Sequence, residues 1–227
     1  MKGLAVLERR NYVRILVFII FCAAAAACAD FVLVGDEAQR IYVPYYGGGG
    51  YEAMRCMEVV RKADGLVAGE ITRWEWYGGE VEGATGKFNR FRVRLCHTSR
   101  AELAPPYNAN FEGRTPTQVF YADPVTVNMK IREWFGFDLQ PSFAYDGTSN
   151  LIVEVWWEGD DDGGGYVFTA DVPGQTRCLL SSIKNGVPQN GYPDQGLACN
   201  WLHYMRLTLS PDAVAPTSLG RVKALYR

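Results

Sequence analysis

The chain has 227 residues, of which 48% are hydrophobic, 13% aromatic and 21% charged, and its formal net charge is −2. This length is sufficient for one β domain with a hydrophobic core. The acidic balance disfavours nucleic acid as a partner, because binding to phosphates requires positive charge. Two histidines are too few for a three-histidine metal site.

The first thirty residues have the layout of a secretory signal peptide. A basic start precedes an apolar stretch over 15–29, which ends in the small-residue cleavage site Ala27-Cys28-Ala29. That stretch is shorter than the roughly 20 residues of a membrane-spanning helix. The basic residues are Lys2, Arg9, Arg10 and Arg14. We therefore expect a signal peptide over 1–29, export to the periplasm, the cell surface or the medium, and a net charge near −5 once four basic residues and one acidic residue are removed.

Two alternative leaders are ranked below simple cleavage. Ala25-Ala26-Ala27-Cys28 resembles a lipoprotein box with Cys28 as the lipidated residue, although the usual leucine three positions earlier is absent. A pilin-like leader would be cut after Gly3 and would place Arg14 in a membrane-embedded helix, which is costly. Membrane attachment is expected only if Cys28 is lipidated or the leader is retained.

Four cysteines follow the leader, and an even number in an exported chain indicates disulfides. Of the three pairings, Cys56–Cys96 with Cys178–Cys199 is favoured, because the second bond closes a loop rich in Gly, Pro and Asn. A zinc site is the disfavoured alternative, since the sequence has no CxxC pair and the expected compartment is oxidising.

Residues 30–209 read as one β-sandwich domain, and 210–227 as a tail with an added strand at Val222–Tyr226. Short alternating segments separated by Gly, Pro and Asn, without an amphipathic helix pattern, predict an all-β antiparallel sandwich of about ten strands, similar to a jelly roll. The predicted strands are 31–34, 39–46, 54–61, 65–77, 88–97, 117–121, 125–128, 134–139, 151–157, 166–170, 176–181 and 201–209. Apolar residues on both faces of 151–157 indicate a central strand.

Several motifs resemble successive landmarks of a β-sandwich module of bacterial secreted and cell-surface multidomain proteins. The matching segments are 95–99, Asn110-Phe111, 117–120, Trp134, Phe137, 143–155, Arg177 and 205–207, within about 39–209. The resemblance implies a β-sandwich in an extracellular setting. It brings no catalytic residues, because the function of that module is unsettled.

Aromatic and arginine side chains are the candidate ligand-binding groups. Trp74 and Trp76 share a strand face near Tyr77, and Trp156 and Trp157 occupy the two faces of one strand. Flat aromatic rings suit sugars and protein partners, although they also fill the core of a thick sandwich. Arg90, Arg92 and Arg94 alternate along one strand face, which is either a solvated face or an anion-binding strip for acidic polysaccharide.

Asp160, Asp161 and Asp162 are a candidate calcium site, because clustered carboxylates supply oxygen ligands. Their spacing is not that of an EF-hand loop, and a solvated acidic loop is the preferred interpretation. No other cofactor is expected. His97 and His203 lie in predicted strands and are interpreted as structural, because the sequence has no nucleophile elbow.

A glycosidase needs two carboxylates astride a cleft. The candidates are Glu70, Glu75, Glu154 and Glu158, all on or beside predicted strands. The leading hypothesis is instead a non-catalytic extracellular module for adhesion, carbohydrate contact or surface assembly, with a glycan or another surface protein as partner. Self-assembly by strand addition, through the terminal strands Phe31–Val34 and Val222–Tyr226, ranks second, and the hydrolase ranks third.

Overall fold

The computed structural model describes residues 29–33, 38–41, 50–79, 84–163 and 167–210. The first strands are β1 (Ala29–Leu33), β2 (Ala38–Ile41), β3 (Tyr51–Val60), β4 (Gly69–Tyr77), β5 (Ala84–Phe88), β6 (Phe91–Thr98), β7 (Thr117–Ala122), β8 (Val125–Met129) and β9 (Trp134–Tyr145). They are followed by β10 (Asn150–Glu158), β11 (Asp160–Gly163), β12 (Val167–Asp171), β13 (Cys178–Lys184), β14 (Val187–Gln189), β15 (Leu197–Cys199), β16 (Trp201–His203) and β17 (Met205–Ser210). Two 3₁₀ helices are η1 (Lys62–Asp64) and η2 (Tyr107–Phe111).

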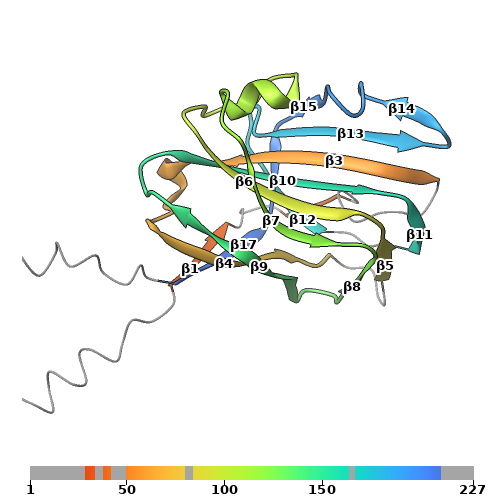
Figure 1. Cartoon of the computed structure of the whole chain (residues 1–227), viewed down its shortest axis with the longest axis horizontal. Coiled ribbons are helices and arrows are strands. Elements are labelled where there is room, and N and C mark those ends of the chain that lie inside the picture. The colour runs from red at the N-terminus through yellow and green to blue at the C-terminus, as the bar shows by residue number, and fades with distance from the viewer. Residues whose placement is uncertain (1–28, 34–37, 42–49, 80–83, 164–166, 211–227) are drawn as a thin grey trace, which may run out of the picture.

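Two sheets make up most of the fold, and Figure 1 shows them as two layers. One has the strand order β1-β17-β4-β9, and the larger has the order β14-β13-β3-β10-β6-β7, with β15 added to β13. Two three-stranded sheets have the orders β11-β5-β8 and β16-β12-β2. All ladders among these strands are antiparallel, which confirms the predicted all-β antiparallel class.

The described strands outnumber the ten or so that were expected. β11, β14 and β15 lie in segments whose Gly, Pro and Asn content predicts turns. Each of them is short and pairs with a neighbouring strand rather than forming a core of its own. The local composition therefore predicted the turns, but it did not predict the short paired strands beside them.

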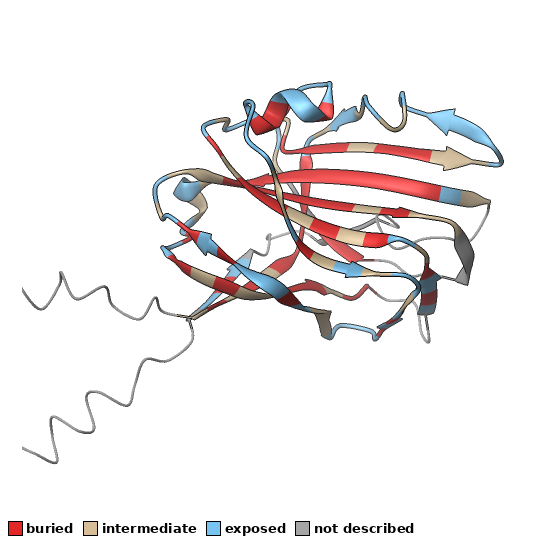
Figure 2. Ribbon diagram, viewed as in Figure 1, coloured by how far each residue is buried: buried red, intermediate tan, exposed pale blue. Residues whose placement is uncertain are grey.

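β10 is the central strand of the larger sheet, as its sequence predicted, and it lies between β3 and β6. Its side chains Leu151, Val153, Val155 and Trp157 join the main core between the layers. Ile152 faces the other way and packs with Tyr107 and Phe111 of η2. Figure 2 shows the buried residues concentrated on these inner strands.

β4 departs from strict alternation. Ile71 and Trp74 are three residues apart and would lie on opposite faces of a regular strand, but the ladder with β9 shifts register between Ile71 and Arg73. Such a bulge adds one residue and reverses which positions face inward. Ile71 is therefore buried before the irregularity, whereas Trp74 is buried after it.

The terminal segments of the chain bear on the hypothesis that the protein self-assembles by strand addition, and the structure describes one of the two. β1 pairs with β17 over five residues, and its Phe31 is buried, so this strand belongs to the domain's own sheet. The proposed partner strand Val222–Tyr226, the tail 210–227 beyond Ser210, and the leader with Cys28 lie outside the described residues. Within the part of the chain that is described, no helix has the length and apolar character to cross a membrane.

Tyr107 connects η2 to the larger sheet and is a test of this packing. Its hydroxyl donates to the carbonyl of Arg55 at 2.9 Å and lies 3.1 Å from Ser181 Oγ. We expect Tyr107→Phe to lower the free energy of unfolding by about 1 kcal/mol, because only hydrogen bonds are lost. Tyr107→Ala should cost about 3–5 kcal/mol, because it also leaves a cavity. Urea unfolding measures both, and a Tyr107→Phe variant as stable as the wild type would contradict the assigned hydrogen bonds.

Candidate functional site

One row of side chains crosses the outer face of the larger sheet, the face turned away from the main core. Strand register places Trp156 of β10 opposite Arg92 of β6 on one side and opposite Arg55 of β3 on the other. Arg92 is in turn opposite Tyr121 of β7. We call these four residues the Trp156 row. It contains two of the residues that the sequence singled out, Trp156 and Arg92.

Cation–π contacts hold the Trp156 row together. The Arg92 guanidinium carbon lies 3.5 Å from the centroid of the Trp156 ring, and that of Arg55 lies 4.7 Å away. The indole Nε1 donates to the hydroxyl of Tyr192 at 2.7 Å. The ring of Trp156 is therefore engaged by guanidinium groups. This corrects its expected role as a platform on which a sugar stacks.

Glu154 is buried beside this row and is held by two arginines. Arg55 Nε donates to Glu154 Oε1 at 2.8 Å, and Arg94 Nε donates to Oε2 at 2.5 Å. Glu154 is only 1% exposed. Arg94 is thus a structural partner of a buried carboxylate, because an unpaired charge at this position would cost several kcal/mol. Neither of the sequence interpretations of Arg94, a solvated face or an anion strip, describes this.

A hollow of about 510 Å³ lies at the end of the same face, where Glu52, Arg90, Glu158, Ile183 and Tyr192 contribute to its lining. Arg90 Nη1 lies 2.9 Å from Glu158 Oε2, and Arg92 Nη2 lies 3.7 Å from Glu158 Oε1. One half-buried carboxylate therefore faces two guanidinium groups. The lining of the hollow itself contains two carboxylates, Glu52 and Glu158, and one guanidinium, Arg90, so the additional positive charge comes from Arg92 beside it.

Arg92 is incompletely satisfied in this arrangement. Its Nε is buried and has no hydrogen-bond partner among the described residues, and its ion pair with Glu158 is long. Burial and the neighbouring Arg94 cation lower the pKa of Arg92 from its usual value, against the attraction of Glu158. An anion placed beside the exposed part of Arg92 would relieve the like-charge repulsion between Arg92 and Arg94.

The remaining predicted aromatics do not belong to this site. Trp74 and Trp76 are fully buried in the main core, on the opposite sheet, so the prediction that they bind a ligand is wrong. Tyr77 stacks on Phe168 and contacts Trp134. The sequence missed Arg55 and Tyr192, because they reach Trp156 only through the pairing of distant segments.

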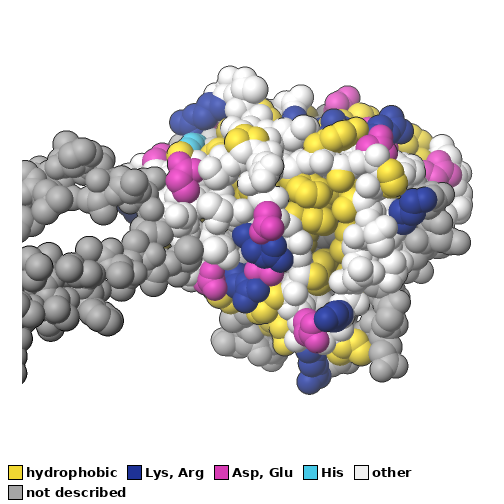
Figure 3. All heavy atoms as spheres, turned by 60° about the horizontal axis from the view of Figure 1, so that its bottom comes forward, with side chains coloured by type: hydrophobic (Ala, Val, Ile, Leu, Met, Phe, Trp, Pro, Cys, Tyr) yellow, Lys and Arg dark blue, Asp and Glu magenta, His cyan; other side chains and the backbone are white. Residues whose placement is uncertain are grey.

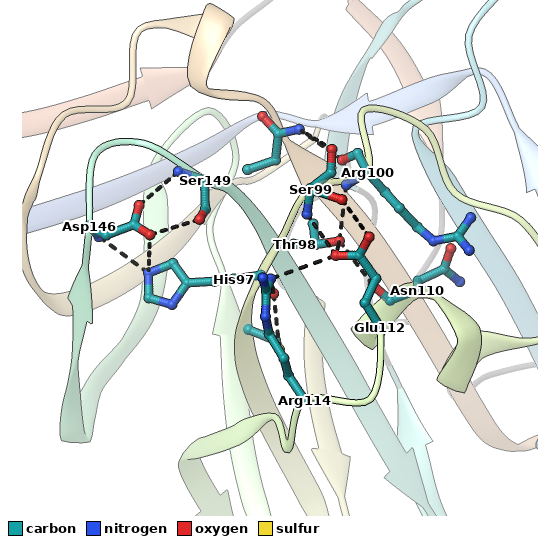
Figure 4. A network of polar contacts seen from close by, with 11 residues as sticks. His97, Thr98, Ser99, Arg100, Asn110, Glu112, Arg114, Asp146 and Ser149 are labelled. Atoms are coloured by element: carbon teal, nitrogen blue, oxygen red, sulfur yellow. Dashed lines mark hydrogen bonds and ion pairs between the residues drawn. The ribbon is translucent and has the colours of Figure 1, made fainter.

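A polar network near the start of β10 contains several of the residues on which the module resemblance rests, among them His97, Ser99 and Asp146 (Figure 4). Asp146 Oδ1 accepts from the backbone N–H groups of Thr148 and Ser149, and Oδ2 accepts from the Ser149 hydroxyl. Glu112 accepts from the backbone and hydroxyl of Ser99 and from the Thr98 hydroxyl. The landmark motifs therefore act by joining loops, which is a structural role.

His97 in this network is not arranged as a catalytic base. Its Nε2 accepts from the backbone N–H of Asp146 at 3.2 Å, and its ring packs on Phe143 and Tyr145. The Ser149 hydroxyl donates to Asp146 instead of to His97. A Ser-His-Asp relay needs the hydroxyl on the imidazole. The structural interpretation of His97 fits these contacts.

The structure places the four candidate carboxylates of a glycosidase on two strands of different sheets, β4 and β10. Glu75 lies on the smaller sheet between Arg73 and Arg206. Glu154 and Glu158 share one face of β10, but four residues of extended strand separate them by about 13 Å. This exceeds the 5–9.5 Å that such mechanisms use. Glu70, also in β4, is paired in register with Ala144 of β9.

All four described cysteines are thiols in the structure. The predicted Cys56–Cys96 bond is wrong, because Cys56 faces the main core whereas Cys96 lies in the cluster on the opposite face of the same sheet. Cys178 and Cys199 are register partners on neighbouring strands, and the disulfide between them stays a prediction. Burial raises the pKa of Cys56 to about 11, and the hydrogen bond with Cys178 lowers that of Cys199.

The candidate calcium residues belong to β11, which pairs with β5, so the expected acidic loop is a short strand. The side chains of Asp160, Asp161 and Asp162 lie outside the described part, and the calcium site stays a prediction. Figure 3 shows another face of the molecule, where acidic and basic side chains lie next to one another around a hydrophobic band. Such mixed charge does not single out an anion site there.

Asp146 provides a test by pH. Partial burial disfavours its ionisation, but the hydrogen bonds from Ser149 and Thr148 outweigh this and hold the pKa of Asp146 well below its usual range. A depressed folded pKa contributes stability that is complete above the unfolded value of about 3.9 and is lost as pH falls toward the folded value. We expect Asp146→Asn to be less stable than wild type at pH 7, with the difference shrinking below about pH 4 in urea titrations. A difference that does not change with pH would contradict this assignment.

Glu154 and Glu158 form a matched pair on one strand face. Glu154→Gln should lower the free energy of unfolding by about 3 kcal/mol or more, because two buried arginine contacts lose their counter-charge. Glu158→Gln should cost less than about 1 kcal/mol, because its ion pairs are partly exposed. Chemical denaturation compares the free energies of unfolding of the two variants directly. Similar losses of stability would argue against the buried ion pairs of Glu154 with Arg55 and Arg94.

No protein-family model matches the chain, and no curated protein matches it. Among solved structures, one similar chain contains the cysteine protease and lectin-like domains of Cwp84, a surface layer associated protein of Clostridium difficile, with 8% identity, a TM-score of 0.35, and coverage of 71% of this chain and 33% of that one. A second is the clostridial cysteine protease Cwp84 after propeptide cleavage, with 8% identity, a TM-score of 0.37, and coverage of 81% and 40%. This chain thus spans less than half the length of either, and likeness at this level identifies no family.

Proposed function

We propose that the chain is a non-catalytic extracellular binding module that holds an acidic polysaccharide on the outer face of its larger sheet. The observation that carries the proposal is the environment of Arg92. Its guanidinium is fixed on Trp156, its Nε lacks a hydrogen-bond partner among the described residues, and Arg90 lies beside the same Glu158. A carboxylate or sulfate group would pair with the accessible part of the Arg92 guanidinium, since this side chain is 28% exposed.

Two further features support a saccharide rather than a small free anion. The hollow of about 510 Å³ has the size of a small-ligand site, and it is lined by polar side chains as well as by Ile183 and Tyr192. Tyr121 of the Trp156 row is 52% exposed and the neighbouring Arg90 is 58% exposed, so both side chains are accessible from solvent. An exposed aromatic side chain such as Tyr121, next to arginine cations, suits a sugar ring that carries an anionic substituent.

The net charge of the chain bears on specificity. The negative balance after removal of the predicted leader opposes general attraction to polyanions. Binding would therefore depend on the local surplus at Arg90 and Arg92. We expect the affinity to fall as salt rises, because Arg90 is exposed and its field is screened.

Binding assays with wild type and arginine variants test the proposal. An array of neutral and acidic polysaccharides, followed by calorimetry on the best ligand, should show acidic ligands binding and neutral ones not. Arg92→Ala should weaken binding about tenfold or more, because a charge-assisted hydrogen bond contributes roughly 1.5–3 kcal/mol. Arg90→Ala should weaken it less.

Arg73→Ala is the matched control, since Arg73 is also partly exposed and paired with carboxylates but lies on the smaller sheet. It should bind like wild type. Absence of binding to every acidic polysaccharide, or unchanged affinity of a folded Arg92→Ala variant, would remove the proposal.

A further inference from the structure

Cys178 of β13 lies between two other thiols on the inner side of the larger sheet. Its Sγ is 3.6 Å from Cys56 Sγ of β3. On its other side, Cys178 is the register partner of Cys199 in β15, and the two side chains are hydrogen-bonded. One sulfur forms only one disulfide at a time, so oxidation of Cys178 must select one of these two neighbours.

Strand geometry selects Cys199 as the partner of Cys178. Residues directly opposite each other on antiparallel strands have Cα atoms about 4.5–5.5 Å apart, which lies within the range of about 4.4–6.8 Å found in disulfides. Cys178 and Cys199 are opposite in this way. The register partner of Cys56 is Leu180, so Cys56 is a diagonal neighbour of Cys178, for which a Cα separation of about 7–8 Å is typical. A bond from Cys178 to Cys56 would therefore require the backbone to move.

The three thiols also differ in their access to solvent. Cys56 and Cys178 are no more than 1% exposed, whereas Cys199 is partly exposed. Cys199 is the last residue of β15, whose first residue, Leu197, is 53% exposed. The hydrogen bond with Cys178 lowers the pKa of Cys199, while burial raises the pKa of Cys178. An external reagent therefore reaches Cys199 first, and Cys199 forms the reactive thiolate more readily.

We propose that Cys199 and Cys178 are a redox-active pair that reacts with small external disulfides such as glutathione disulfide. The Cys199 thiolate attacks one sulfur of the reagent, a mixed disulfide forms, and the small thiolate that leaves takes up the proton that Cys199 lost. Cys178 then attacks the Cys199 sulfur, and the second small thiolate leaves with the proton of Cys178. Two protein thiols are oxidised to one disulfide, and the reagent is reduced to two thiols.

The accessible sulfur of Cys199 makes this bond exchangeable rather than a permanent cross-link. An external thiol can attack an exposed disulfide sulfur, which reverses the reaction. Cys56 and Cys96 stay thiols throughout, because Cys56 is only a diagonal neighbour of Cys178 and Cys96 lies on the opposite face of the sheet. The pair is on the core side of the larger sheet, away from the Trp156 row, and the inference does not depend on the proposed function.

The test uses the full chain in reduced form and glutathione disulfide as the reagent. Peptide mapping without reductant should find Cys178 bonded to Cys199 in the wild type. Cys178→Ser should accumulate one glutathione on Cys199, because the second step is blocked. Cys199→Ser should slow the modification of Cys178 at least about tenfold, because the buried thiol loses its accessible partner. Cys96→Ser is the matched control, since Cys96 is also buried but faces the other side of the sheet, and it should behave like wild type.

Substitutions beside a core can impair folding, so the wild-type chain supplies two further measurements. Brief treatment of the reduced chain with iodoacetamide should label Cys199 at least about tenfold faster than Cys56, Cys96 or Cys178. Excess reduced glutathione should open the Cys178–Cys199 bond while circular dichroism shows that the chain stays folded.

Three results would overturn the proposal. One is similar labelling rates for these four thiols in the folded wild type. Another is a peptide map in which glutathione disulfide links Cys178 mainly to Cys56, or leaves both Cys178 and Cys199 reduced. The third is a Cys178–Cys199 bond that glutathione opens only after the chain has been unfolded, because that would make it a structural cross-link.

Discussion

Burial of both faces of β10 is the constraint on which the rest of the described structure depends. Its inward side chains fill the space between the two layers, which is the ordinary requirement of a sandwich. Its outward side chains include a carboxylate, Glu154, which a low-dielectric environment tolerates only when it is paired and hydrogen-bonded. The neighbouring strands β3 and β6 meet this requirement with Arg55 and Arg94.

The same register that neutralises Glu154 places further arginines where neutralisation is incomplete. Two residues further along β10, the guanidinium groups of Arg92 and Arg55 contact the ring of Trp156. At the end of the strand, Arg90 and Arg92 both pair with Glu158. Along this face of β10, the ion pairs are therefore complete at Glu154, whereas near Glu158 the positive charge of the arginines is only partly neutralised. The binding site we propose is a continuation of the ion pairs that hold the sheet together.

Alternation along β3 separates the Trp156 row from the main core. Arg55 faces outward to the Trp156 row, and the next residue, Cys56, faces inward to the main core. Successive side chains of a strand point to opposite faces, so chemistry on one side is screened from the other by the sheet itself. The polar network around Asp146 and Glu112 plays a third role, because it fixes the loops at the end of β6 and the start of β10.

Sequence alone determined the β class, the central position of β10 and the alternating arginines, because these depend on period-two patterns and turn residues that act locally. It could not locate the bulge in β4 that puts Ile71 and Trp74, three residues apart, in the same core. It also could not pair the cysteines or bring Tyr192 to Trp156. Those outcomes depend on which distant strands are neighbours and which face each residue presents, and only the tertiary structure decides both.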